Sequence, residues 1–376
     1  MNGRALAATL LIAVGCAAPQ PRAAPPAPRP APPAPPPPAP ALPAIPSPRS
    51  QEPLVLERVT QLELQPARAS TSGQKVEGSV ADVAFLPPDG RSVVAVGNDD
   101  RAWIAELTRG RAHWKSRPLG KDAERVVVCG KRFAVQTSGG GLAVYEWVPE
   151  GRGRVIDRGR FELGSGKLLG LFTGCTQAAY ATLDDKLIAF DVQLGSVAKV
   201  MRDASYAHFD TRVTENGWLF VPGGPRPRLL NLGTDESIEP ELAAPSGDGR
   251  LMQAFVVAGD QILTEHCTAA RACVVRLLDF KGRPRLEHHF DGSAGVWTSD
   301  VPSRIAISAE LRYLAWYRDG LPLQVVESET GRRAQLPSIQ RTPSAVVAAA
   351  FSPYEAGKLA VSLTPEPNQV TLFDLR

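Results

Sequence analysis

The sequence has little excess charge and few aromatic side chains. Its 42 Lys and Arg residues nearly balance 39 Asp and Glu residues, so the formal net charge is +3, and only 6% of the chain is aromatic. A nucleic-acid-binding protein would show a strong basic excess or a basic stripe, so the composition gives no case for that class of partner. Hydrophobic residues make up 43% of the chain, which is enough for a buried core.

The chain also lacks the short motifs of common enzymes. A GxSxG nucleophile elbow, a Walker loop, a dinucleotide fingerprint, CxxC and HExxH are all missing. Asp-rich turns such as 98–100 and 184–185 lack the spacing of a calcium loop, and hairpin turns favour these residues anyway. Glu265-His266-Cys267 has no second ligand pair at zinc spacing, and the adjacent His288 and His289 are expected at the surface. We therefore assign no catalytic, cofactor-binding or metal-binding residue and expect no cofactor.

The N-terminus has the organisation of an export signal. Arg4 precedes an apolar stretch of ten residues, Ala5–Val14, which is shorter than the roughly 20 residues that span a bilayer. The following Ala13-Val14-Gly15-Cys16 resembles the lipobox of bacterial lipoproteins, although that family usually has Leu in the place of Ala13. The resemblance implies a signal peptide at 1–15 and lipidation of Cys16. A plain secretory signal with a chance cysteine is the alternative.

The prolines are concentrated directly after this signal. Sixteen of the 35 prolines fall within residues 19–48. Such a segment cannot form a core or a sheet, and thirty residues of polyproline II helix reach on the order of 90 Å. Residues 16–52 are therefore interpreted as a lipidated cysteine and a stiff tether, with a PxxP ligand as the alternative. Ala17, rather than Asp, follows the cysteine, which by resemblance to the enterobacterial sorting rule implies the outer membrane, with the domain periplasmic or surface-exposed.

A repeat occupies the rest of the chain. Its most regular phrase is an apolar run that ends near an acidic or amide residue, and the spacings between these residues are 40, 45, 40, 48, 48 and 47: Glu106, Glu146, Asp191, Asn231, Asp279, Glu327 and Asp374. Each period contains short β-type runs separated by turns rich in Asn, Asp, Gly and Pro, followed by a more polar segment. This period is typical of a four-stranded propeller blade.

The strand count predicts how the ring closes. Seven three-strand sets are followed by only six polar segments, because the sequence stops at Arg376. The stretch 54–64 (LVLERVTQLEL) can supply the missing strand and remove the open sheet edges. The expected fold is therefore all-β: a seven-bladed β-propeller, with eight blades as the alternative, over 53–376 and closed by the N-terminal strand 54–64.

Two motifs resemble a known family. Phe85-Leu86-Pro87-Pro88-Asp89-Gly90 and Phe351-Ser352-Pro353, together with Leu372-Phe373-Asp374, look like the FSPDG and terminal V/W-D signatures of WD40-like and TolB-like propellers. The Gly-His dipeptide and the Trp-Asp blade ends of true WD40 repeats are missing. The resemblance implies a divergent bacterial propeller.

Four cysteines remain after Cys16, and an even number in an exported protein suggests disulfides. Cys267 and Cys273 flank one turn, where a bridge would connect a hairpin. Cys129 and Cys175 end the innermost strands of neighbouring periods, where a bridge would join two blades. Buried free thiols are the alternative.

The expected function is binding rather than catalysis. Propellers bind partners with strand-connecting loops, and Trp297 lies in the long loop 291–303, either as a binding hot spot or packed onto a blade. We expect a membrane-anchored propeller, a monomer or a subunit of a hetero-complex, that binds a protein or glycan or scaffolds an envelope complex. The alternative is a propeller enzyme with a site at the central channel: a quinoprotein-like dehydrogenase, a lyase or a hydrolase.

Overall fold

The computed structural model describes residues 53–63, 80–108, 111–150, 153–201, 211–222, 226–242, 250–257, 260–268, 272–291, 304–317, 323–335, 346–363 and 369–376. All of them belong to one compact unit of the chain, Ala44–Arg376. Cys16, the tether 16–52 and Trp297 lie outside the described residues. Within the described residues, no helix is long and apolar enough to cross a membrane.

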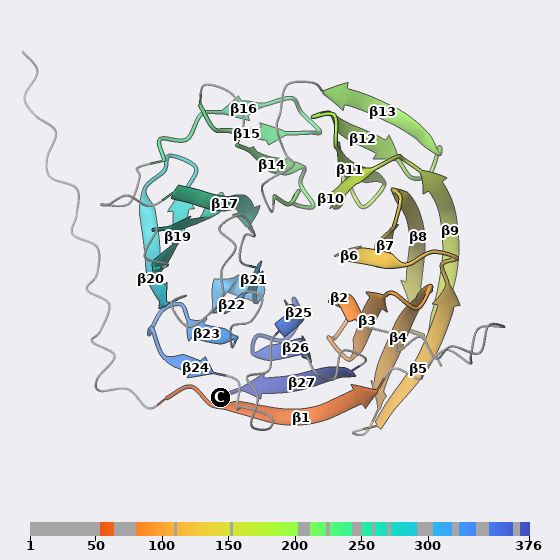
Figure 1. Ribbon diagram of the computed structural model, residues 1–376, viewed down its shortest axis with the longest axis horizontal. Helices are drawn as coiled ribbons and strands as arrows, with labels where there is room; N and C mark the ends of the chain where they lie inside the picture. Colours follow the sequence, from red (N-terminus) through yellow and green to blue (C-terminus); the bar gives the residue numbers. More distant parts are fainter. Residues whose placement is uncertain are drawn as a thin grey trace, which may run out of the picture. The chain divides into compact units, whose positions relative to one another are not determined.

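The strands form seven antiparallel sheets placed around a ring (Figure 1), which we number as blades in chain order. Blade 1 contains β2 (Val80–Leu86), β3 (Ser92–Gly97), β4 (Arg101–Thr108) and β5 (Arg111–Pro118). Blade 2 contains β6 (Ala123–Cys129), β7 (Arg132–Thr137), β8 (Gly141–Val148) and β9 (Arg154–Glu162). Blade 3 contains β10 (Gly166–Phe172), β11 (Gln177–Thr182), β12 (Leu187–Asp191) and β13 (Ser196–Met201). This arrangement confirms the predicted seven-bladed propeller.

The second half of the ring repeats the pattern. Blade 4 contains β14 (Trp218–Val221), β15 (Arg228–Asn231) and β16 (Ser237–Ile238), and blade 5 contains β17 (Arg250–Val257), β18 (Gln261–Cys267), β19 (Ala272–Asp279) and β20 (Pro284–Asp291). Blade 6 contains β21 (Arg304–Ile307), β22 (Tyr313–Tyr317), β23 (Gln324–Glu327) and β24 (Arg333–Gln335). Blade 7 contains β25 (Val346–Phe351), β26 (Lys358–Leu363), β27 (Gln369–Leu375) and β1 (Leu56–Glu63). The short 3-10 helix η2 (Ala309–Leu311) lies between β21 and β22. In blade 4 the described sheet has three strands, preceded by a single bridge from Val213 to Leu219.

An N-terminal strand completes blade 7. β1 pairs antiparallel with β27, in a register that runs from Leu56 opposite Leu375 to Glu63 opposite Gln369. Beyond these strands, the backbones of Val55 and Arg376 exchange two hydrogen bonds, of 2.9 and 3.0 Å. The last blade is therefore built from both ends of the propeller sequence, and the ring is closed by backbone pairing.

The core is divided among the junctions between blades. Seven clusters of buried side chains occur, and each consists of residues from two adjacent blades. Middle strands are largely apolar on both faces because a blade lies on each side; β3, for example, is buried at all six positions. The outer β13 is exposed or half-buried throughout, as expected of a strand that faces water.

The repeated acidic or amide residue has a local structural role. The Oδ1 atom of Asp191 accepts hydrogen bonds from the N–H groups of Gln193 and Leu194, at 2.8 and 2.9 Å. Asn231 and Asp279 accept from the residues two and three or four positions ahead in the same way. In these three periods the side chain therefore caps the turn between the third and fourth strands, which accounts for the acidic or amide residue at that position.

Both expected cysteine pairs are joined. Cys129–Cys175 connects blades 2 and 3 with a Cα–Cα distance of 5.5 Å, and Cys267–Cys273 connects β18 and β19 across the hairpin with a Cα–Cα distance of 4.1 Å. The first bridge links neighbours in the ring, and the second links two strands of one blade.

Candidate functional sites

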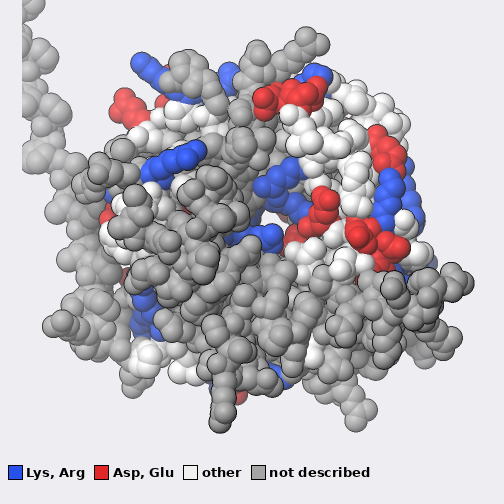
Figure 2. All heavy atoms as spheres, in the orientation of Figure 1, with Lys and Arg blue, Asp and Glu red and all other residues white. Residues whose placement is uncertain are grey.

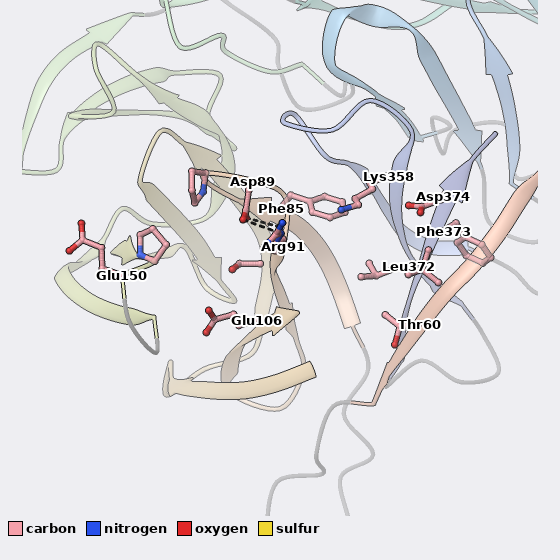
Figure 3. A pocket seen from close by; sticks show the side chains of 14 residues that line it. Thr60, Phe85, Asp89, Arg91, Glu106, Glu150, Lys358, Leu372, Phe373 and Asp374 are labelled. Atoms are coloured by element: carbon pink, nitrogen blue, oxygen red, sulfur yellow. Dashed lines mark hydrogen bonds and ion pairs between the residues drawn. The ribbon is translucent and has the colours of Figure 1, made fainter. Parts of the chain in front are cut away.

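A groove of about 830 Å³ crosses the junction between blades 7 and 1 and reaches blade 2 (Figure 3). It lies where β2 turns into β3 and where the third strands of the blades end. Figure 3 places Glu150 at one end of the groove and Thr60 and Asp374 at the other, with Arg91 and Glu106 between them. The groove is lined by Val59, Thr60, Phe85, Pro88, Asp89, Arg91, Ser92, Glu106, Pro149, Glu150, Lys358, Leu372, Phe373 and Asp374.

The lining combines an apolar floor with a charged rim. Phe85, Leu372 and Phe373 belong to the buried core of the flanking blades. Around them stand four carboxylates and two cations: Asp89, Glu106, Glu150, Asp374, Arg91 and Lys358. Asp89 and Arg91 form an ion pair at 3.3 Å with both side chains largely exposed, so water screens it and it remains available for exchange with a partner.

The two sequence motifs that resemble propeller signatures meet at this groove. Gly90 has a φ of +65° and approaches the Ser352 hydroxyl so closely that a Cβ atom at position 90 would overlap it. The Ser352 Oγ atom in turn accepts hydrogen bonds from the N–H groups of Tyr354 and Glu355, both at 3.2 Å. The motif glycine is needed here because two turns from adjacent blades pack directly against each other.

A second site is a cluster of charged side chains at the central channel, formed by Asp82, Arg125, Arg212 and Arg304. Asp82 lies on β2, Arg125 on β6, Arg304 on β21, and Arg212 immediately before the bridge residue of blade 4. Figure 2 shows Lys, Arg, Asp and Glu side chains gathered around an opening at the centre of the ring. We call these four residues the channel cluster.

Irregular backbone positions these side chains. The register between the first two strands shifts near the start of the inner strand in blades 1 and 2, directly before Asp82 and Arg125. Similar shifts occur in β10, β17 and β25. A β-bulge turns the following side chain relative to the regular pleat. The bulges therefore set the direction in which the inner strands present their polar residues.

The channel cluster is held by hydrogen bonds to the backbone. Asp82 accepts from the N–H groups of Val83 and of Val126 in the next blade, at 2.9 and 3.0 Å. Arg212 reaches from blade 4 to blade 6, where its Nη2 atom donates to the carbonyl oxygen of Ile305 at 2.9 Å. Its guanidinium lies 4.7 Å from the centre of the Phe255 ring of blade 5, which supports it from one side.

Burial and charge oppose each other at Asp82. Burial raises the pKa of its carboxyl above the usual value, while the two backbone hydrogen bonds and the charges of Arg125 and Arg304 lower it. Nearby, burial raises the pKa of Tyr317, and Arg304, Asp82 and Arg212 all act on that hydroxyl. Because guanidinium groups stay protonated, the positive charges that act on Asp82 and Tyr317 persist over the physiological pH range.

The side chains around Glu265 serve to connect blades. Glu265, Cys267 and Cys273 have ligand atoms within 4.8 Å of one another, but the two sulfurs are joined in a disulfide. The Glu265 carboxylate accepts hydrogen bonds from Gln253 and from Trp316 of blade 6, at 2.7 and 2.6 Å. This group therefore links blades 5 and 6.

The surface assignment of the adjacent histidines is half wrong. His289 is exposed, but His288 is only 6% exposed and lines a small apolar cavity between blades 5 and 6. Burial lowers the pKa of His288 to about 4. Adjacent residues of a strand point to opposite faces, and the face of β20 that carries His288 packs against the next blade, so this outer strand is solvated on one face only.

The sequence patterns predict neither the groove nor the channel cluster. The groove combines residues from three blades, and the motif residues that line it indicate a family resemblance but not a groove. Two of the channel arginines did carry a signal: Arg125 and Arg304 lie near the start of the innermost strand in the second and sixth periods. The predicted hot spot Trp297 lies outside the described residues and stays a prediction.

Comparison with known proteins supports the architecture. No protein-family profile matches the chain, and no curated protein matches it. Among solved structures, it is similar to the C-terminal WD40 domain of Sif2, with a TM-score of 0.57 and 10% sequence identity over 86% of this chain and 99% of that domain. At this identity the likeness concerns the fold alone. The chain therefore folds as a WD40-like β-propeller.

Proposed function

We propose that this chain is a lipid-anchored, non-enzymatic propeller of the cell envelope that binds a protein or glycan partner or scaffolds an envelope complex. The groove across blades 7, 1 and 2 carries the proposal. The exposed apolar side chains of its lining, Val59 and Pro88, offer area for burial, while its rim provides charges that orient a partner. With four carboxylates against two cations, it best fits a protein segment that carries basic as well as apolar side chains.

The anchor and the groove belong together in this proposal. The tether expected at 16–52 leads directly into β1, and Val59 and Thr60 of β1 line the groove. A partner bound there would lie next to the strand through which the propeller is attached to the membrane. Support for the anchor comes from the lipobox-like Ala13–Cys16 and the proline-rich segment, with the outer membrane as the proposed location.

Site-specific photo-crosslinking tests the groove. A photoreactive amino acid is placed at Glu150 on the groove rim, and at Gln193 as the matched control. Both residues are exposed in the turn between the third and fourth strands, in blades 2 and 3 respectively. We expect a discrete adduct in cells only from position 150, and its loss when Asp374→Lys is added. Identical adducts from both positions would refute the groove as the partner site.

Two further substitutions test the lipid anchor and the predicted hot spot. Cys16→Ser should abolish incorporation of labelled fatty acid and release the protein from the membrane fraction; continued labelling would refute lipidation at this residue. Trp297→Ala should reduce the yield of crosslinked partner. An unchanged yield would remove Trp297 from the binding surface and leave the groove as the site.

A second candidate function is a propeller enzyme with its site at the channel. The convergence of Asp82, Arg125, Arg212 and Arg304 favours it, because polar groups from several blades meet there as they would in an active site. In that case, turnover found in a screen of dehydrogenase, lyase and hydrolase substrates should be abolished by Asp82→Asn. Turnover that is unchanged in this variant would exclude the channel as the active site.

A further inference from the structure

Two carboxylates of the groove occupy a repeat position that is engaged elsewhere in the ring. In five periods, the acidic or amide residue near the end of the third strand caps a turn or forms an ion pair: Asp191, Asn231, Asp279, Glu146 and Glu327. In the other two periods, Glu106 and Asp374 line the groove, and neither side chain forms a hydrogen bond or ion pair with a described residue. The same is true of Glu150 at the end of the groove (Figure 3). These three carboxylates can therefore accept cations from a ligand.

The cations of the groove do not neutralise these carboxylates. Arg91 pairs with Asp89 at 3.3 Å, and Lys358 pairs with Glu355 at 2.5 Å. The groove therefore keeps an excess of negative charge. Beside it, Val59 of β1 contributes an apolar side chain that is 53% exposed. A ligand that fits this combination carries positive charge and small apolar surfaces, and it has no acidic side chains that the groove would repel.

One segment of the chain outside the described residues has this composition. Residues 19–48 contain sixteen prolines, and most of the remainder are alanines. The charged residues of this segment are Arg22 and Arg29, and the first acidic residue of the chain is Glu52. Proline-rich segments lose little conformational entropy on binding and are recognised in grooves that offer apolar contacts. The segment therefore complements the groove in charge and in apolar character.

Chain order brings this segment within reach of the groove. It leads into β1, which begins at Leu56, and Val59 lies about 10 Å further along that strand. Arg29 precedes Leu56 by more than twenty residues, which span on the order of 60 Å as polyproline II. Residues 49–52 contain no proline, so the chain can reverse its direction there. A segment attached so close to its site has a high effective concentration, so weak contacts suffice for binding.

We infer that residues 19–48 bind in the groove of their own chain. The guanidinium groups of Arg22 and Arg29 pair with the groove carboxylates, while neighbouring prolines pack against Val59. The inference rests on the groove of the proposed function but needs no external partner, so either can fail without the other. An external partner with basic side chains would compete with this segment for the same carboxylates.

Intramolecular photo-crosslinking of the purified full chain in detergent tests the inference. A photoreactive amino acid is placed at Val59 in the groove, and at Val197 as the matched control. Both valines lie on outer strands, β1 and β13, and they are 53% and 51% exposed. Mass spectrometry of the monomer should find crosslinks from position 59 to residues 19–48, with a yield at least about fivefold above that from position 197.

Two double variants test the charge complementarity. Glu106→Gln/Asp374→Asn should lower the yield from position 59 about three- to tenfold, because it removes two negative charges from the groove. Glu236→Gln/Glu241→Gln removes the same charge from exposed positions around β16 of blade 4 and should leave the yield unchanged. Equal yields from these two double variants would overturn the inference.

The arginines of the segment provide an independent test. Arg22→Gln/Arg29→Gln should also lower the yield from position 59 about three- to tenfold. Both residues lie outside the propeller, so this variant decides the matter if the groove variant does not fold, as judged by circular dichroism. The inference is overturned by an unchanged yield in this variant, by equal yields from positions 59 and 197, or by crosslinks found only in dimers, which would assign the segment of a second copy. Adducts formed in cells from position 150 still test the proposed partner separately.

Discussion

The junction between blades 7 and 1 and the junction between blades 2 and 3 hold the same architecture together by different means. At the first, apolar side chains such as Phe85, Trp103 and Leu372 fill the interface, and backbone pairing of β1 with β27 completes the adjoining blade. At the second, a disulfide and a buried glutamine are added to the apolar packing. Ring closure thus relies on strand pairing, while a covalent bond reinforces blades that are neighbours in sequence.

The two devices connect segments that lie at different distances along the chain. Cys129 and Cys175 are separated by 46 residues, so their bridge constrains a moderate loop of the unfolded chain. The strands β1 and β27, which pair to close the ring, lie at opposite ends of the propeller sequence. Residues of both strands line the groove. The strand pair that closes the ring therefore also contributes to the candidate binding surface.

The largest expected effect comes from emptying the core of the closing junction. Phe85 is 2% exposed and packs within the cluster shared by blades 7 and 1. Phe85→Ala should lower the free energy of unfolding by about 3–5 kcal/mol, because it removes a buried ring and leaves a cavity. Urea unfolding followed by tryptophan fluorescence measures the loss. A change below about 1 kcal/mol would contradict the assigned packing.

Removing the disulfide between blades 2 and 3 should lower the free energy of unfolding by a comparable but slightly smaller amount. For the 46-residue separation of Cys129 and Cys175, the chain-entropy model gives about 4 kcal/mol. The double variant Cys129→Ser/Cys175→Ser should lose that much stability, whereas Cys267→Ser/Cys273→Ser, with a separation of 6 residues, should lose about 2 kcal/mol. The reverse order of the two variants in urea midpoints would argue against the loop-length explanation.

Acid should weaken a third junction, between blades 5 and 6. Burial lowers the pKa of His288 to about 4 in the folded protein, whereas the unfolded value is about 6.5. The unfolded chain therefore binds more protons below about pH 6.5, and stability should fall between pH 6.5 and 4, by on the order of 3 kcal/mol for this residue. Burial also lowers the pKa of His266 in the same blade to about 4, so His288→Phe should remove about half of the total fall in stability. An unchanged profile would exclude His288 as a source.

Gln136 should matter less than the disulfide in the same junction. It is 4% exposed, donates to the Gly166 carbonyl at 2.8 Å and accepts from the Leu168 N–H group at 2.6 Å, so it joins blade 2 to blade 3. Gln136→Leu keeps the volume but leaves those two backbone groups unpaired, at a cost of about 1–3 kcal/mol. Hydrogen exchange at Leu168 should become faster, and unchanged protection there would refute the bridging role.

The smallest change in stability is expected from the ion pair that joins the two ends of the propeller sequence. Arg376 and Glu57 form an ion pair at 2.9 Å, with side chains that are 70% and 51% exposed. Glu57→Gln should change stability by less than about 1 kcal/mol, because exposed pairs are screened by water. Thermal unfolding at low and high salt is the measurement. A larger loss would show that ring closure depends on charge as well as on strand pairing.

Much of the fold could be read from local patterns. The turn residues and β-branched runs recur with one period, and the missing fourth strand pointed to the stretch 54–64, where the structure has β1 (Leu56–Glu63). The cysteine pairing followed from placing Cys129 and Cys175 at equivalent ends of adjacent inner strands. His288 shows the limit of this reasoning, because polarity of an outer strand does not reveal which of its faces meets the next blade.

The repeat, the blade number and the expectation of a signal, a lipidated Cys16 and a stiff tether follow from the sequence, because these depend on residues close together along the chain. The groove and the channel cluster appear only when the chain is folded. Asp82 and Arg304 are more than two hundred residues apart, and Phe85 meets Leu372 only when the first and last blades pack together. Sites of this kind arise from ring closure, which brings equivalent positions of distant repeats to one axis.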